Sequence, residues 1–430
     1  MRRNQIVDSI RTTNKGAGMI SVFTPSHDPK YLTECYTSLN EQTYEDWEWI
    51  VLLNNGAEWT GPKDERVKIQ RSTAEGKGVG YYKGQAILQC RGDIFLELDH
   101  DDVLIPTALE EVNHVFATYE DVVFTYSQFS QINADGTPNG DRFDLNHGWT
   151  YKDIDGYNVA AGFPPYPHNV SYIWYAPNHL RAFRADAYKK VNGYDPTRYI
   201  LDDQDIMAKF FQIGEFYYIR ENLYLQRVHG DQTQVQQETN AKIQVETVEL
   251  YHKYIERNTM AWARRRKLHC LDLGAAHDKP EGYLGVDIHG GPNVNYIGDF
   301  LELDLPDNSC GLIRAYDFLE HITDKVAVMN KIWKLLAHGG MLLTMTPDSS
   351  GRGAHQDPTH VSFWNENSFW YFTEDSYRKY VPEIEAKFQP SWVKTFYPSP
   401  WHQEKQISYV HANLIAVKNN NRDFGGLTWI

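Results

Sequence analysis

Short β-rich runs alternate with segments that can form helices, and this alternation occurs in two regions of the chain. In the first region the runs cover residues 19–25, 48–53, 67–69 and 94–99, with helix-compatible stretches between most of them. Such alternation predicts a mostly parallel sheet, because neighbouring parallel strands need a crossover that usually contains a helix. Ligands of such sheets gather at the carboxyl ends of the strands. The pattern therefore predicts an α/β fold and the edge at which a binding site should lie.

A stretch without glycine or proline separates the two regions. Residues 232–263 carry good helix formers, so we expect a helical linker there. Beyond Arg264 the β-rich runs return as LHCLDLG, YLGVDI, GLIRAYDF and GGMLLTMTP. A chain of 430 residues also exceeds what one hydrophobic core usually serves. We therefore expect a first α/β domain over residues 1–231, the linker over 232–263 and a second α/β domain over 264–430.

One long part of the first domain breaks the alternation. Residues 141–178 are rich in Gly, Pro, Asn and aromatic side chains. Loops of this length without regular structure are uncommon and usually functional when ordered. We expect an acceptor-side loop there.

Composition and charge narrow the class of partner. The formal net charge of −15 repels phosphate backbones, so nucleic acid is an unfavourable partner.

No apolar run approaches the length that spans a bilayer, and residues 1–16 lack the apolar stretch of a signal peptide, so we expect a cytoplasmic protein. The oligomeric state stays open. Scattered spacing argues against a disulfide framework or a thiolate zinc site for Cys35, Cys90, Cys270 and Cys310.

An acidic cluster follows the run at residues 94–99. Asp99, Asp101 and Asp102 stand almost together, and clustered carboxylates are costly without a cation. Asp99 and Asp101 are two apart, so they project to the same side of an extended chain. A divalent ion bridging to a diphosphate would satisfy both carboxylates. The alternative is an acid-rich loop that caps the next helix.

Five motifs stand in order along residues 19–232. They are ISVFTPSHDPKYLTECYTSLNEQTYEDWEWIVLLNNG, GDIFLELDHDDVL, FRADAYKKVNGYD, LDDQD and VHGDQT. In this order they resemble the family 2 glycosyltransferases of the GT-A fold, which bind a nucleotide sugar. The resemblance implies an inverting transfer of a sugar from a nucleotide-sugar donor, of the UDP or GDP type, to a glycan or other hydroxyl acceptor.

The resemblance also implies roles for single residues. Asp203 matches the family's catalytic base, and the adjacent Asp202 is its rival for that role. Asp99 and Asp101 match the motif that binds Mn²⁺ or Mg²⁺ with the donor diphosphate, and His229 matches a late histidine that completes the metal shell. The residues implied to line the nucleotide pocket are Thr24, Pro25, Ser26 and Asp28.

The chain departs from the family pattern after the second β-rich run. Asn54 and Asn55 stand where the family usually has an acid that contacts the base of the nucleotide. An amide offers both a donor and an acceptor, so we expect nucleotide binding to survive with the preferred base open. Lys83, after the glycine-rich residues 76–80, can hold a phosphate oxygen; the alternative is a solvated helix lysine.

Four motifs stand in order in the second domain: LDLGAA at 271–276, GVD at 285–287, DFLEHI at 317–322 and HGGMLLTMTP. In this order they resemble the class I methyltransferases that use S-adenosylmethionine, and the resemblance implies a Rossmann-like fold. It implies that Asp272 and Gly274 lie near the methionine end of the cofactor and that Asp287 takes the ribose hydroxyls.

Two features weaken the cofactor site of this second domain. Ala276 and His277 occupy places where further glycines let a cofactor approach the backbone. Few residues separate Gly274 from Gly282, so the first helix should shrink to a turn. We therefore expect S-adenosylmethionine to bind weakly or not at all, with methyl transfer left open.

A further group of polar residues allows two interpretations. His355, Asp357 and His360 have donor types that can ligate a metal, but Pro358 favours a turn held by side-chain hydrogen bonds equally well. No metal is assigned to this domain.

The sequence thus favours a glycosyltransferase of polysaccharide or glycoconjugate synthesis with a methyltransferase-like second domain. One alternative is a DNA hydroxymethyl-base glycosyltransferase, which the acidic charge disfavours. The other is a glycosyltransferase whose second domain is only a binding scaffold.

Overall fold

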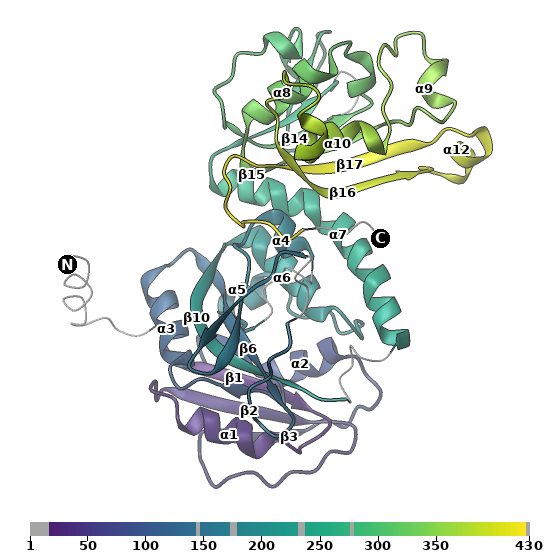
Figure 1. Cartoon of the computed structure of the whole chain (residues 1–430). Helices are drawn as coiled ribbons and strands as arrows, with labels where there is room; N and C mark the ends of the chain where they lie inside the picture. The colour runs from purple at the N-terminus through teal and green to yellow at the C-terminus, as the bar shows by residue number, and fades with distance from the viewer. Residues whose placement is uncertain (1–16, 143–146, 173–178, 231–236, 276–278, 427–430) are drawn as a thin grey trace, which may run out of the picture. The chain divides into compact units, whose positions relative to one another are not determined.

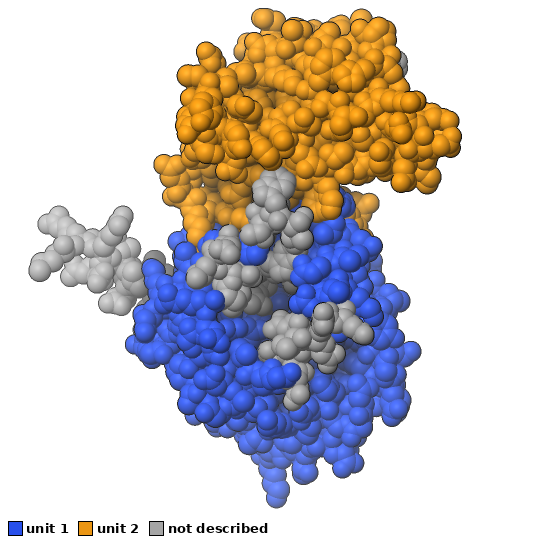
Figure 2. Space-filling view, turned by 45° about the vertical axis from the view of Figure 1, so that its right-hand side comes forward, with its two compact units in different colours: residues 1–165, 169–252 blue, residues 166–168, 253–430 orange. Residues whose placement is uncertain are grey.

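The computed structural model describes residues 17–142, 147–172, 179–230, 237–275 and 279–426. The chain divides into two compact units (Figure 2). Unit 1 comprises Met1–Pro165 with Asn169–His252, and unit 2 comprises Tyr166–His168 with Lys253–Ile430. Among the described residues, no helix is both long enough and apolar enough to cross a membrane.

Unit 1 is built on one mixed sheet whose strand order is β3-β2-β1-β4-β9-β6-β10-β5 (Figure 1). Its first four strands are parallel, as the alternating pattern predicts, while β9 runs antiparallel to both β4 and β6. The strands are β1 (Ile20–Ser26), β2 (Trp47–Leu53), β3 (Val67–Arg71), β4 (Ile94–Glu97), β5 (Val103–Leu104), β6 (Val122–Asn133), β9 (Ala182–Arg184) and β10 (Glu215–Val228).

Helices connect these strands and bury apolar stripes. Helix α3 buries Leu109, Val112, Val115 and Phe116, which recur at the spacing of one helix face. The helices of this part of the chain are α1 (Leu32–Asn40), α2 (Val79–Ile87), α3 (Ala108–Thr118), α4 (Pro167–Ser171), α5 (Ala185–Lys190), α6 (Asp202–Ile213) and α7 (Gln237–Arg265). The continuous helix α7 covers most of the stretch expected to be a helical linker.

A hairpin stands where the sequence predicts an irregular loop. Strands β7 (Thr150–Ile154) and β8 (Tyr157–Ala161) pair antiparallel, and β8 also pairs with β6. Asp155 and Gly156 form the two-residue turn with φ of 53° and 81°. An Asp-Gly pair suits a turn that needs two positive φ angles, so the prediction of irregular structure is wrong over these residues. Residues 143–146 and 173–178 lie outside the described chain.

Unit 2 has a second sheet in the order β13-β12-β11-β14-β15-β17-β16. The first five strands are parallel, and β17 runs antiparallel to both of its neighbours. The strands are β11 (His269–Leu273), β12 (Leu284–Asp287), β13 (Val294–Ile297), β14 (Cys310–Tyr316), β15 (Leu336–Pro347), β16 (Phe388–Phe396) and β17 (Tyr409–Ala416). Both sheets therefore confirm the predicted α/β class.

The helices of unit 2 are mostly short. Helix α8 (Lys325–Leu335) packs Val328, Met329 and Ile332 into the core. The shorter elements are η3 (Phe300–Glu302), η4 (Leu319–His321), α9 (Gly353–Gln356), η5 (Glu366–Phe369), α10 (Trp370–Thr373), α11 (Asp375–Arg378) and α12 (Pro400–Lys405). In the β11–β12 connection the described residues 274–275 and 279–283 form no helix, and Ala276 and His277 lie outside the described chain.

Candidate active site

The carboxyl ends of β1, β2 and β4 meet at one edge of the first sheet. Ser26 stands opposite Leu53 in the parallel register, and the Asn54 N–H donates to the Ser26 carbonyl at 2.9 Å. On the other side of β1, Phe23 stands opposite Glu97, two residues before Asp99. The segments expected to bind the nucleotide and the metal therefore leave the sheet next to one another.

The residues implied for the nucleotide pocket divide into buried and accessible groups. Thr24 and Ser26 are fully buried. The Thr24 hydroxyl donates to the Leu98 carbonyl at 2.7 Å and accepts the Trp49 indole N–H at 2.9 Å. Pro25 is partly exposed and Asp28 is exposed. Thr24 thus joins β1 to its neighbours, and surface for a ligand remains at the other two positions.

The two asparagines after β2 have different surroundings. Asn54 is buried, with only 4% of its surface exposed. Asn55 is exposed and has a φ of 49°. Its side-chain oxygen accepts hydrogen bonds from the Tyr82 hydroxyl at 2.9 Å and from the Gly76 N–H at 3.2 Å. Asn55 therefore anchors the glycine-rich stretch before α2 at the site edge.

The acidic loop after β4 contacts the end of β10. The Asp101 carboxylate and His229 Nε2 are 2.9 Å apart, with 16% and 20% of their side chains exposed. Asp99 is half-buried, and burial, followed by the neighbouring charge of Glu97, raises its pKa to about 7. The structure thus brings Asp101 and His229 into contact, while burial and the charge of Glu97 disfavour the ionised form of Asp99.

Asp99 belongs to a different group of potential ligands from Asp101 and His229. Donor atoms of Asp99, Asp102 and His179 all lie within 4.8 Å of one another. Asp102 and His179 are buried, and the His179 ring stacks on Tyr224 with centroids 4.3 Å apart. Sequence reasoning passed over His179, which lies in the aromatic region before β9.

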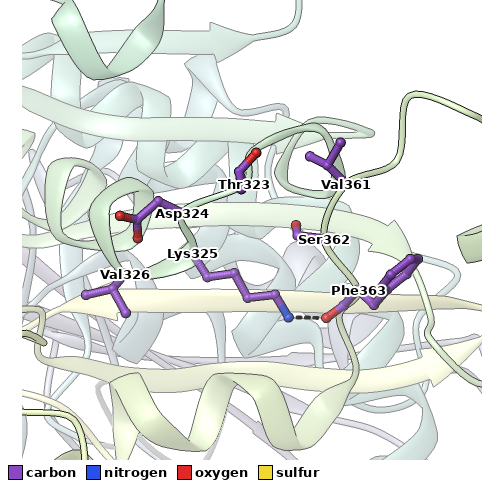
Figure 3. Close-up of a pocket in the computed structure, with 7 residues that line it drawn as sticks. All are labelled: Thr323, Asp324, Lys325, Val326, Val361, Ser362 and Phe363. Carbon is purple, nitrogen blue, oxygen red and sulfur yellow. Dashed lines mark hydrogen bonds between the residues drawn. The ribbon is translucent and has the colours of Figure 1, made fainter.

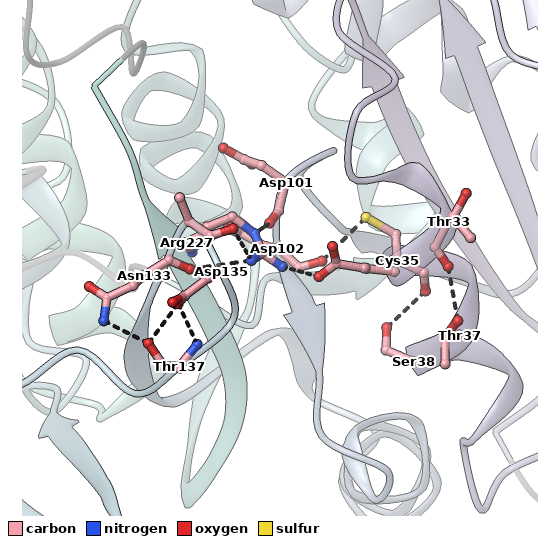
Figure 4. A network of polar contacts seen from close by, with 12 residues as sticks. Thr33, Cys35, Thr37, Ser38, Asp101, Asp102, Asn133, Asp135, Thr137 and Arg227 are labelled. Carbon is pink, nitrogen blue, oxygen red and sulfur yellow. Dashed lines mark hydrogen bonds and ion pairs between the residues drawn. The ribbon is translucent and has the colours of Figure 1, made fainter.

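Arg227 contacts the acidic loop at Asp101 and Asp102 (Figure 4). Its side chain is fully buried; its backbone N–H donates to Asp102 Oδ1 and its Nε donates to the Asp101 carbonyl, both at 2.7 Å. Its other nitrogens pair with Glu34 at 2.6 Å and donate to the carbonyls of Asn133 and Ala134. This arginine was not singled out from the sequence, although it lies two positions before His229.

The Cys35 thiol lies under the same loop. It is buried and donates weak hydrogen bonds to the carbonyls of His100 at 3.4 Å and Asp102 at 3.3 Å. Burial, followed by the charge of Asp102, raises the pKa of this thiol well above its ordinary value.

Lys83 forms part of a buried ion network, which corrects its expected role. Its ammonium group lies 2.8 Å from both Glu97 and Asp202, and only 6% of its side chain is exposed. Burial alone would lower the pKa of Lys83, but the two carboxylates raise it above its ordinary value. Neither the phosphate-binding role nor the alternative of a solvated lysine describes this position, because α2 turns Lys83 toward β4 and α6.

Arg181 extends this network to Asp203. Its guanidinium group pairs with Glu97 and with Asp203 Oδ2, each at 3.0 Å. Burial would raise the pKa of Glu97, but Lys83 and Arg181 lower it to about 2. Asp203 keeps 20% of its side chain exposed, against 7% for Asp202. Both acids occupy the first turn of α6, and Asp203 is the more accessible.

The residues implied for a cofactor in unit 2 lie near the carboxyl ends of β11 and β12. Asp272 is buried and pairs with Arg314 at 2.8 Å. Gly274 has a φ of 79° and begins the β11–β12 turn. Asp287 ends β12 and accepts the His289 N–H at 2.8 Å. The three stand at one edge of the sheet, but an arginine already engages Asp272.

The hypothetical ligand group on residues 355–360 does not assemble. His355 Nε2 lies 3.2 Å from the Ser349 carbonyl, and Asp357 accepts both the N–H and the hydroxyl of Thr359. Asp357 therefore forms the side-chain turn that was the alternative interpretation. His360 lies instead beside Glu320 and His321.

Two family models match parts of the chain, one in each unit. Residues 21–164 match the family model described as Glycosyl transferase family 2. Residues 276–344 match the model described as Methyltransferase domain.

Curated relatives match part of the chain. Chondroitin synthase of Escherichia coli is 23% identical over 54% of this chain and 32% of its own length. The O-antigen biosynthesis protein RfbC of Myxococcus xanthus is 29% identical over 27% of this chain and 10% of its own. The O-antigen biosynthesis glycosyltransferase WbnJ of Escherichia coli is 30% identical over 27% of this chain and 49% of its own length. The chain spans less than half the length of each.

Solved structures of S. aureus TarS also resemble this chain. The complex of TarS 1-349 with UDP-GlcNAc has a TM-score of 0.41 and 12% identity, and the match covers 58% of this chain and 72% of that one. The assignment rests on the two family models and on the order of the motifs in the sequence. By these matches the chain contains a family 2 glycosyltransferase domain followed by a methyltransferase domain.

Proposed function

We propose that this protein is an inverting glycosyltransferase of polysaccharide or glycoconjugate synthesis. It moves a sugar from a nucleotide-sugar donor to a hydroxyl of a glycan or other acceptor. The observation that carries the proposal is the 2.9 Å contact of Asp101 with His229 at the carboxyl edge of the first sheet. Asp101 lies within residues 21–164, which match the Glycosyl transferase family 2 model. The names of the curated relatives, a chondroitin synthase and O-antigen biosynthesis proteins, support the substrate class.

The residues at this edge fit a divalent cation. Asp99 and Asp101 offer carboxylate oxygens and His229 offers an imidazole nitrogen, a donor set that suits Mn²⁺ better than Ca²⁺. Burial, followed by the neighbouring charge of Glu97, raises the pKa of Asp99 to about 7, and a bound cation would favour the charged form of this carboxyl group. A bound cation would neutralise charge on the departing nucleoside diphosphate. Arg227 and Cys35 fix the backbone of this loop, so its side chains are held in place before a donor arrives.

We assign the role of general base to Asp203. Inverting transfer is a single displacement at the anomeric carbon, so one carboxylate must accept the proton of the acceptor hydroxyl. Asp203 is partly exposed, whereas the side chain of Asp202 is buried against Lys83. Arg181 and the Gln204 N–H hold the two oxygens of Asp203 at 3.0 and 2.8 Å. These contacts orient the carboxylate and leave the proton-accepting lone pairs to the exposed side.

We further propose that the donor nucleotide binds along the ends of β1 and β2. Pro25 and Asp28 offer accessible surface there, and Asn55 joins the glycine-rich stretch to the same edge. UDP or GDP is the expected nucleotide. Residues 1–231 would then carry the transfer reaction, with 232–263 as the linker and 264–430 as the methyltransferase-like domain.

A thermal-shift series tests the donor and metal assignments together. We expect one of UDP, GDP, CDP and dTDP to raise the melting temperature in the presence of Mn²⁺ and much less in its absence, because a ligand that binds only the folded state stabilises it. His229→Ala should abolish the Mn²⁺-dependent part of the shift. His114→Ala is the matched control, because His114 is exposed on α3. A shift that is unchanged in His229→Ala would remove this histidine from the metal site.

A further inference from the structure

A second group of metal-binding side chains lies in unit 2, apart from the glycosyltransferase site. Donor atoms of Glu320, His321 and His360 all lie within 4.8 Å of one another. Glu320 and His321 belong to η4, which follows β14, and His360 comes from the segment after α9. Backbone hydrogen bonds hold the two segments together, because the N–H groups of Val361 and Ser362 both donate to the Glu320 carbonyl.

The hydrogen bonds of the two histidines leave one ring nitrogen of each available. His360 Nδ1 lies 3.2 Å from the Ala354 carbonyl. His321 Nδ1 lies 3.2 Å from both the carbonyl and the hydroxyl oxygen of Thr359, and that hydroxyl donates its own hydrogen to Asp357 Oδ1. A carbonyl oxygen can only accept, so in each neutral ring Nδ1 carries the proton and Nε2 keeps its lone pair. Metal-binding histidines are commonly oriented in this way, with one ring N–H donated to a backbone carbonyl.

Glu320 adds an independent observation. Only 2% of its surface is exposed. Its Oε2 accepts the Thr346 hydroxyl at 2.7 Å, whereas its Oε1 is buried with no hydrogen-bond partner among the described residues. A buried carboxylate oxygen without a partner is costly, and coordination to a cation would satisfy it.

We propose that Glu320, His321 and His360 form a binding site for one divalent transition-metal ion. Two imidazole nitrogens and one carboxylate oxygen suit Zn²⁺, whereas Ca²⁺ prefers six to eight oxygen ligands. His321 is exposed and His360 half-exposed, so a fourth position stays open to water or a ligand. This site is independent of the glycosyltransferase proposal, because it uses none of the same residues.

An open pocket of about 570 Å³ adjoins the site along the chain (Figure 3). Its lining comprises residues 323–326 and 361–363, which directly continue the segments that carry His321 and His360. Lys325 spans this pocket and donates to the Phe363 carbonyl, which joins the start of α8 to the segment after His360.

Metal analysis of the full chain tests the site. After treatment with a chelator, the protein is titrated with Zn²⁺ and with Co²⁺, and bound metal is counted per chain by elemental analysis and by the visible spectrum of Co²⁺. We expect His321→Ala and His360→Ala each to remove one equivalent and to lower Zn²⁺ affinity more than about 100-fold, since loss of even an outer-shell partner costs 10- to 100-fold. Glu320→Gln should also lower the affinity for Zn²⁺, and it keeps the shape of the side chain.

His355→Ala is the matched control, because this exposed histidine is held by Ser349 outside the group. It should retain full Zn²⁺ binding. Circular dichroism of each variant separates loss of the site from loss of the fold. His229→Ala distinguishes the two sites, because it should remove only the equivalent bound by unit 1. Unchanged Zn²⁺ binding in a folded His321→Ala, His360→Ala double variant would overturn the proposal.

Discussion

Two adjacent aspartates at the start of α6 differ in what surrounds them. Asp202 faces inward to the Lys83 ammonium group, while Asp203 faces Arg181 and remains partly exposed. Only a carboxylate that an acceptor can reach can remove the acceptor's proton in the transition state. The motif in the sequence favours Asp203, and the lower burial of its side chain supports the same choice.

We expect Asp203→Asn to lower the turnover number by roughly 100- to 10,000-fold, the usual contribution of a general base. Donor binding should stay nearly unchanged, because an amide keeps the shape of the side chain. The measurements are the transfer rate under saturating donor and the donor dissociation constant. Asp202→Asn should retain far more turnover; the reverse result would assign the base to Asp202.

Lys83 provides a prediction about stability. Lys83→Met would leave Glu97 and Asp202 buried with one cation fewer, and breaking a buried ion pair typically costs about 3 to 5 kcal/mol. We expect the free energy of unfolding, measured by urea denaturation, to fall by about this amount. Lys190→Met removes an exposed pair with Asp186 and should change it by less than about 1 kcal/mol. If Lys83→Met and Lys190→Met lowered the free energy of unfolding by the same small amount, the buried ion network would contribute little to stability.

The sequence could identify the acids of this site but not the cations that hold them. Asp99, Asp101 and His229 carry recognisable motifs, and the structure places Asp101 and His229 in contact. Lys83 was expected beside a phosphate, because its partners on β4 and α6 are distant in the chain and no local pattern reveals them. Arg181 and Arg227 escaped notice for the same reason.

At the scale of elements, the β-rich runs predicted strands well and the turns poorly. The runs that became β1, β2, β4 and β11 are short, apolar and bounded by polar segments, so their pattern is unambiguous. The sequence does not predict the hairpin β7–β8, because β7 is largely exposed and neither strand shows apolar alternation. The Asp155-Gly156 pair was the signal that could have revealed it.

The β11–β12 connection leads to a prediction about S-adenosylmethionine, because a helix is expected there in this class of methyltransferase and its described residues, 274–275 and 279–283, form none. That helix and its glycine loop normally wall the cofactor pocket. The described residues of the β11–β12 connection form only turns, so we expect calorimetry to find weak binding or none. A dissociation constant in the low micromolar range that is lost in Asp287→Ala would contradict this expectation and favour an active methyltransferase.

At the scale of the whole molecule, one buried histidine makes stability depend on pH. His168, assigned to unit 2, has its ring nitrogens 2.9 Å from Ser391 Oγ and from the Gly425 carbonyl. Burial lowers the pKa of His168 to about 4. Between that value and about 6.5 the unfolded chain binds a proton that the folded chain does not, so this stabilisation is lost as pH falls.

We therefore expect His168 to make folding about 2 kcal/mol less favourable at pH 5 than at pH 7, by linkage between the two pKa values. Urea denaturation at both pH values measures the difference. In His168→Gln the loss on acidification should shrink by this amount. His269→Gln, which changes an exposed histidine at the start of β11, should behave like the unaltered chain. An identical loss in both variants would exclude His168 as the source.

The thiol beneath the acidic loop makes chemical reactivity a measure of local opening. Cys35 touches the carbonyls that follow β4, so a reagent such as an aromatic disulfide can reach its sulfur only when that loop lifts. In a Cys90→Ser variant, which lacks the more accessible thiol of unit 1, the labelling rate of Cys35 would report how often the acidic loop opens. Mn²⁺ with the correct nucleoside diphosphate should slow that labelling. The labelling rate of Cys35 would then report donor binding, although the thiol takes no part in the reaction.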